Sequence, residues 1–158
     1  MEYDIRKIKE NEYILLNDFL YEAIFIPEGV TAPPREIINL PELQVYTADF
    51  GRRNGDLALV AETDNKIIGA VWVRIMNDYG HIDDETPSFA ISLYKEYRNN
   101  GIGTALMKAM LDKLKTAGYK QASLAVQKAN YAVKMYKKAG FEIVDENDEE
   151  YIMLCKFR

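Results

Sequence analysis

Hydrophobic and polar residues alternate along several short stretches of the chain, and this two-residue period predicts β-strands. The stretches are residues 3–8, 57–63, 66–76, 88–94, 121–127, 141–146 and 150–157. The polar pair Asp64-Asn65 separates the second stretch from the third, which is typical of an antiparallel hairpin. Within residues 88–94, Phe89, Ile91 and Leu93 are expected on one face of a strand.

A period near 3.6 predicts helices between these strands. Residues 10–25 form one amphipathic pattern that ends before Pro27, and a longer pattern runs from Ile102 to Gly118. Shorter helices are expected near Pro34 and over residues 130–139. Strands and helices that interleave in this way predict one α/β domain over residues 1–158.

Composition narrows the possible functions. The 158 residues carry a net charge of −5, which argues against a nucleic-acid partner and is compatible with a cationic one. Cys155 and His81 are the single cysteine and histidine, so an internal disulfide and a cysteine- or histidine-rich metal site are excluded. The sequence has no segment typical of a signal peptide or a membrane span, and we expect a cytoplasmic protein with no membrane partner.

A glycine-containing turn, Arg98-Asn99-Asn100-Gly101-Ile102-Gly103-Thr104, connects an expected strand to the longest expected helix. The first amides of a helix lack internal partners and bind anions, and glycine lets a ligand approach the backbone. The turn therefore predicts a phosphate site. It lacks the lysine of a P-loop and the third glycine of the dinucleotide fingerprint, and a simple tight turn is the alternative interpretation.

A second motif changes the balance between these interpretations. Arg98-x-x-Gly101-x-Gly103, followed by Asn130, Tyr136 and Gly140-Phe141, resembles the two sequence motifs of the GCN5-related N-acetyltransferase (GNAT) family. The resemblance covers residues 57–157, while residues 1–56 correspond to the variable acceptor side of that family. It implies a mixed, mostly antiparallel sheet splayed between its fourth and fifth strands, with helices on both faces.

The resemblance also implies a site for acetyl-CoA, as a co-substrate, without a metal. The backbone of Ile91, Ser92 and Leu93 would bind the pantetheine arm, and Asn130 would lie near the cofactor. Tyr136 would bind there too and protonate the leaving thiolate, with packing as the alternative role; for Asn130 the alternative is helix capping. The pyrophosphate would bind to Arg98, Asn99, Asn100, Gly101, Ile102, Gly103 and Thr104.

The general base and the acceptor site are less defined by the sequence. Residues 88–93 and 121–126 contain no Asp, Glu or His, so a base on these strands is not expected. The remaining candidates are Glu62, Asp78, His81, Asp83, Asp84 and Glu85. Side chains that could line the acceptor site are Tyr21, Glu22, Phe25, Trp72 and Arg74, although Trp72 also fits the core. A basic group that could meet the 3′-phosphate, or form a solvated helix face, comprises Lys128, Lys134, Lys137 and Lys138.

The function that these features predict is direct acetyl transfer from acetyl-CoA to an amine. The acceptor would be a small molecule or a peptide or protein amine, and a homodimer is possible. The alternative is a non-catalytic acyl-CoA sensor or interaction module on the same fold, because a fold does not establish a function.

Overall fold

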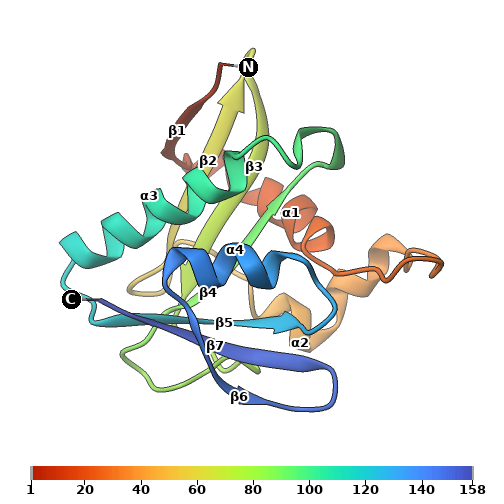
Figure 1. The fold of residues 1–158 in the computed structure, drawn as a ribbon. Helices are drawn as coiled ribbons and strands as arrows, with labels where there is room; N and C mark the ends of the chain where they lie inside the picture. Colours follow the sequence, from red (N-terminus) through yellow and green to blue (C-terminus); the bar gives the residue numbers. More distant parts are fainter. Residues whose placement is uncertain (1, 158) are drawn as a thin grey trace.

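One seven-stranded sheet organises the computed structural model, which describes residues 2–157 (Figure 1). Its order is β1-β2-β3-β4-β5-β7-β6, and every neighbouring pair is antiparallel except β4 and β5. The strands are β1 (Asp4–Lys7), β2 (Leu57–Thr63), β3 (Lys66–Arg74), β4 (Ser88–Leu93), β5 (Gln121–Gln127), β6 (Glu142–Glu146) and β7 (Glu150–Lys156). The mixed sheet expected from the sequence is thereby confirmed.

The helices cover both faces of this sheet, as expected. They are α1 (Leu16–Glu22), α2 (Pro41–Gln44), α3 (Ile102–Thr116) and α4 (Ala132–Ala139), with 3₁₀ turns η1 (Glu10–Leu15), η2 (Arg35–Asn39) and η3 (Lys95–Tyr97). In Figure 1, α3 and α4 lie in front of the sheet and α1 lies behind it. One core packs α3 and α4 against residues such as Phe89 and Met153, and the second packs α1 against Val60 and Trp72.

The first helix differs from the prediction of one helix over residues 10–25. The Glu12 carboxylate accepts hydrogen bonds from the Lys9 amide (2.8 Å) and from Arg6 (2.9 Å), which ties this segment to β1 as a 3₁₀ turn. The α-helix then ends at Glu22. Residues 23–26 are consequently non-helical, and they lie beside the cavities described below.

Trp72 and Arg74 are both fully buried. The prediction that Arg74 lines the acceptor site is therefore wrong, and the alternative of core packing is confirmed for Trp72. The Trp72 indole donates to the Tyr46 carbonyl oxygen (3.1 Å). Arg74 forms a two-point ion pair with Asp56 and also donates to the Val45 and Ala48 carbonyls. A buried guanidinium needs several acceptors, and all of these acceptors lie in the segment before β2. Arg74 of β3 therefore anchors that irregular segment.

Candidate active site

Strands β4 and β5 diverge close to the residues where they begin. Their only paired residues are Ser88 and Ser123, near the beginning of each strand, where the Ser123 amide donates to the Pro87 carbonyl (3.0 Å). Beyond this point β4 is paired on one side only, with β3. An unpaired strand edge offers N–H and C=O groups to an amide-containing ligand.

A cavity of about 930 Å³ opens beside this edge. Its walls come from the end of β4, the turn before α3, the start of α4 and the chain that follows α1. Ten of the twelve residues expected at the cofactor site line it: Ile91, Ser92, Leu93, Arg98, Asn99, Gly101, Gly103, Thr104, Asn130 and Tyr136. The structure thus brings together residues that lie up to 45 positions apart in the sequence.

Asn100 and Ile102 are the two that do not line the cavity. The Ile102 side chain is 1% exposed and packs in the core, because the first residue of an amphipathic helix faces the sheet here. Asn100 is exposed, and its side-chain amide faces the Tyr97 carbonyl (3.5 Å). For Asn100 and Ile102, the prediction that remains is contact between a ligand and their backbone.

The turn before α3 has the backbone shape of an anion site. Asn99 (φ 65°) and Gly101 (φ 80°) adopt left-handed conformations, and α3 begins directly afterwards. The first intrahelical amide bond runs from Ala105 to Gly101, so the amides of residues 102–104 have no helical acceptor. With 15 residues and no acidic side chain in its first turn, α3 presents an unneutralised positive dipole end to the cavity.

Replacing Gly101 with valine should weaken acetyl-CoA binding at least about 10-fold. A left-handed backbone costs an L-residue about 1–2 kcal/mol, so the turn relaxes away from the shape that exposes its amides. Gly118→Val is the matched control, because Gly118 has φ +93° and open space around it at the other end of α3. Both variants should lose similar stability, and equal dissociation constants for acetyl-CoA in calorimetry would contradict the assignment.

Arg98 has protein partners as well as a place in the cavity wall. Its Nε donates to the Leu93 carbonyl (3.0 Å), and a terminal nitrogen faces the Glu22 carboxylate (3.3 Å) and carbonyl (3.2 Å). The guanidinium therefore joins the end of β4 to the end of α1. Contact between Arg98 and a phosphate stays a prediction.

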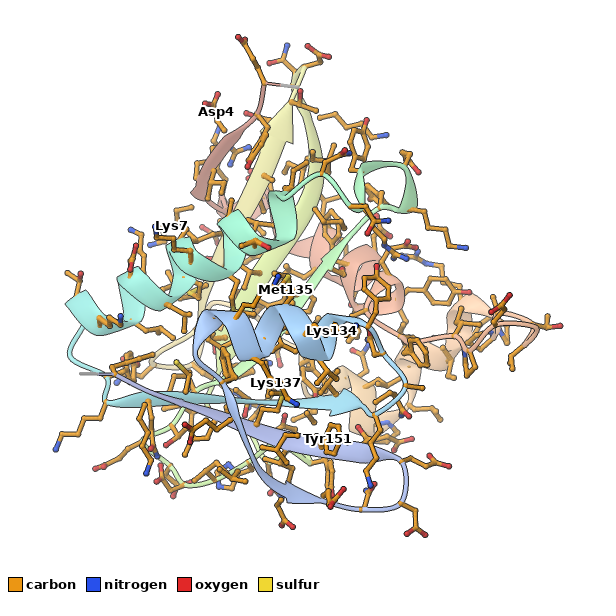
Figure 2. The ribbon with its side chains drawn as sticks, viewed as in Figure 1. Asp4, Lys7, Lys134, Met135, Lys137 and Tyr151 are labelled. Carbon is orange, nitrogen blue, oxygen red and sulfur yellow. The ribbon has the colours of Figure 1, made fainter. Side chains whose placement is uncertain are left out.

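The expected basic group lies away from both cavities. Lys134 and Lys137 are exposed on α4 (Figure 2), and Lys138 is exposed beside them. Lys128 pairs with Glu146 (2.6 Å) and lies over the Tyr151 ring. None of the four lines a cavity, which favours the solvated helix face. Lys95, which the sequence did not single out, does line the larger cavity.

A second cavity of about 260 Å³ adjoins the first and shares Tyr136 with it. Six residues line both cavities: Ala23, Ile24, Phe25, Ile91, Asn130 and Tyr136. Of the acceptor residues expected near α1, Phe25 lies at this junction, while Tyr21 and Glu22 line the larger cavity alone. The junction is therefore the place where a ligand from one cavity can meet a ligand from the other.

Tyr136 is positioned by packing and remains protonated. Its ring lies edge-on to Phe141 with centroids 6.1 Å apart, and burial raises its pKa well above the usual value of 10. None of the described residues accepts or donates a hydrogen bond at its hydroxyl, and no described polar side-chain atom is sealed without a partner. The hydroxyl consequently opens into the cavities, where it can donate a proton.

Asn130 contacts the start of α4. Its Oδ1 accepts a hydrogen bond from the Ala132 amide (2.9 Å). The N-cap residue of this helix is Tyr131, which makes no side-chain cap, so Asn130 contacts the helix from the position before the cap. Asn130 also lines both cavities, and its contact with a cofactor stays a prediction.

None of the six base candidates lines either cavity. Glu62 pairs with Arg6, and His81 lies against the Met76 carbonyl (2.9 Å) and Asp84. Asp78 is held by Tyr46 (3.1 Å) and Ser88 (3.0 Å), and burial raises its pKa. Asp83, Asp84 and Glu85 belong to the surface loop that leads to β4.

Glu150 and Tyr46 are cavity residues that the sequence did not point to. Glu150 begins β7 and pairs with Gln127 of β5. It shares a strand face with Ile152, opposite to the face of Met153 and Cys155 that packs under α3 and α4. Strand alternation over residues 150–155 could have separated Glu150 from its acidic neighbours.

The fold and the site together define a class of protein. Its free strand edge and helix start suit a phosphate-bearing, amide-containing ligand, and a smaller cavity for a second molecule adjoins that site. Comparisons with known proteins agree. A family model described as the acetyltransferase (GNAT) family matches residues 20–141, and the chain therefore belongs to this family.

Among curated relatives, "Probable N-acetyltransferase san" of Drosophila melanogaster is 33% identical over 101 residues, which cover 61% of this chain and 53% of that protein. An "N-alpha-acetyltransferase" of Sulfurisphaera tokodaii is 31% identical over 94 residues, covering 54% and 56%. The matched segment is thus about half the length of these curated relatives.

Solved structures share the fold over nearly the whole chain. The PaiA N-acetyltransferase of Thermoplasma acidophilum, in complex with coenzyme A, has a TM-score of 0.69 and 21% identity, with 99% of this chain and 100% of that chain covered. The yncA protein of Salmonella typhimurium, with acetyl-CoA, has a TM-score of 0.72 and 13% identity, with 99% and 94% covered.

Proposed function

We propose that this protein transfers an acetyl group from acetyl-CoA directly to an amine. The observation that carries the proposal is the junction of two cavities at Tyr136. A ternary complex of both substrates needs such a junction, because direct transfer requires the amine and the acyl group to be held in contact.

The larger cavity fits acetyl-CoA, which supplies the activated acetyl thioester. The amides of residues 102–104 would bind the pyrophosphate, and the free edge of β4 at Ile91, Ser92 and Leu93 would align the pantetheine arm. Gly103 lies in the wall of this cavity, where a Cβ would make ordinary contacts with Leu93 and Met135 (3.6 Å each).

Tyr136 would protonate the departing thiolate. A phenol with a raised pKa is fully protonated at neutral pH, and its hydroxyl opens at the junction. Cys155 is not a covalent relay in this proposal, because it is buried in β7 and burial raises its pKa.

The acceptor would be a small-molecule amine or the amine of a peptide or protein. Relatives and neighbours include an N-alpha-acetyltransferase and, at 15% identity, the ribosomal-protein-S18-alanine N-acetyltransferase of Escherichia coli. The second of these names specifies a protein amine, and a small-molecule amine stays the other candidate acceptor for this chain. A cytoplasmic location and a homodimer also stay predictions; the described residues include no helix that is long and apolar enough to cross a bilayer.

The test is thiol release from acetyl-CoA over a panel of amines. The panel contains a monoamine, a polyamine, a peptide with a free N-terminus and a peptide with an internal lysine. Release that depends on one of these amines, with the acetylated product seen by mass spectrometry, is the expected result. Binding of acetyl-CoA without release for any amine would favour the sensor instead.

A further inference from the structure

The smaller cavity is lined by 16 residues, and one of them is charged. Glu150 enters from β7, while most of the wall consists of apolar residues from α1 and the segment that follows it, from β4 and from β5. Polar side chains other than Glu150 come from Tyr46, Gln127, Asn130 and Tyr136. A ligand in this cavity therefore meets a single negative charge in a mainly apolar space.

No described cation neutralises Glu150. The ion pairs of the described residues do not include it, and Lys128, the lysine just beyond its strand partner Gln127, is paired with Glu146. No described donor binds its carboxylate oxygens; its own amide donates to Asn147 Oδ1 (2.7 Å), which fixes the backbone at the start of β7. Strand β7 therefore positions the Glu150 carboxylate, and neither of its oxygens has a described partner.

The part of the cavity wall at Tyr46 supplies neither a cation nor a free base. The Tyr46 hydroxyl donates to Asp78 Oδ2 (3.1 Å), and Asp78 Oδ1 accepts from Ser88 (3.0 Å). The Asp78 carboxylate is thus occupied behind Tyr46 and does not line the cavity. Among the carboxylates of the described residues, only Glu150 lines this cavity.

We propose that Glu150 binds the ammonium group of the acceptor and takes the proton that this group must lose before acetyl transfer. This inference rests on the proposed function and identifies the catalytic base that residues 88–93 and 121–126 do not provide. It also specifies the acceptor as an amine that arrives as a cation. Because ligand pockets commonly measure about 300–1,000 Å³, a cavity of about 260 Å³ admits a small amine or the amine-bearing end of a larger one.

The proton balance involves Glu150 and Tyr136, which both line the cavity. Glu150 accepts one proton from the ammonium, and the neutral nitrogen forms the N–C bond to the acetyl carbon as the C–S bond breaks. Tyr136 gives its proton to the sulfur and regains one from the newly acylated nitrogen. Glu150 is half-buried, so it returns its proton to solvent. The products are an amide, a free thiol and one proton.

The surroundings of Glu150 strengthen its carboxylate as a proton acceptor. Burial raises its pKa above the usual 4.5, and the Glu149 carboxylate adds to the effect. The other titratable groups that its charge influences are Tyr46 and Tyr79, both with raised pKa values and both neutral in this range. A higher pKa makes a carboxylate a stronger proton acceptor.

The decisive variant is Glu150→Gln, which keeps the shape and removes the charge. With the best amine of the panel, kcat/KM for the amine should fall about 100-fold at pH 7, whereas KM for acetyl-CoA should stay within about twofold. The deficit should shrink as the pH approaches the pKa of the amine, since more acceptor then arrives neutral. A purely structural role would not produce this pH dependence.

Glu142→Gln is the control, because Glu142 is an exposed acid of β6 that lies outside both cavities. It should retain kcat/KM within about twofold. If Glu150→Gln behaves like Glu142→Gln, or loses activity equally at every pH, the inference is overturned.

A binding measurement separates this inference from the proposed function. With coenzyme A bound, n-butylamine (a cation at pH 7) should shift the ¹³C carboxyl resonance of Glu150, and the uncharged 1-butanol should not. Absence of that shift overturns the amine site even if some amine is acetylated. A shift without acetylation of any panel amine overturns the transferase proposal and leaves the amine site in place.

Discussion

Tyr136→Phe should lower kcat by at least about 100-fold while the dissociation constant of acetyl-CoA stays within about twofold. The substitution removes one oxygen from a ring that packs on Phe141 and keeps the ring itself, so α4 and the cavity wall are retained. What is lost is the hydroxyl at the junction of the two cavities. A positioned general acid typically contributes about 10²–10⁴-fold to rate.

Tyr151→Phe is the control for this variant. Tyr151 lies on β7 (Figure 2), outside both cavities. The Lys128 ammonium lies over its ring. The control variant should keep kcat within about twofold. Pre-steady-state thiol release separates chemistry from product release, and an unchanged chemical step in Tyr136→Phe would leave packing as the role of this tyrosine.

Asp56→Ala should lower the free energy of unfolding by about 3–5 kcal/mol, because it leaves the Arg74 guanidinium buried without its counter-ion. The side chains of the pair are 0% and 1% exposed, with a nitrogen–oxygen distance of 2.8 Å. Asp56 also accepts from the amides of Gly51 (2.9 Å) and Arg53 (3.2 Å). Urea unfolding of the native and variant chains measures the loss.

Glu62→Ala provides the comparison for the buried pair. Glu62 also pairs with an arginine, Arg6, but both side chains are at least 25% exposed, and such pairs contribute about 0–1 kcal/mol. The double variant Asp56→Ala/Arg74→Leu should recover part of the loss, since it removes the unpaired charge. A loss below about 1 kcal/mol for Asp56→Ala alone would contradict the role of this pair.

Local signals accounted for most of the fold. The strands at residues 57–63 and 121–127 have the predicted bounds, because alternation and the polar turn at Asp64-Asn65 act within a few residues. The left-handed Gly101 and Gly118 mark the ends of α3, as expected from residue type. The 3₁₀ form of residues 10–15 was missed, because contacts between Glu12 and Arg6 of β1 decide it.

The sequence by itself determined the mixed sheet, the glycine turn and the motif tyrosine, since each depends on residues close in the chain or on a resemblance between short motifs. Only the tertiary structure decided that Arg74 is a buried ion-pair partner and that Glu150 lines the smaller cavity. The face of Glu150 depends on the register of β7 against β5, a strand more than 20 residues earlier. Composition and periodicity carry no information about such a pairing, because the free energy that fixes it comes from contacts formed only in the folded chain.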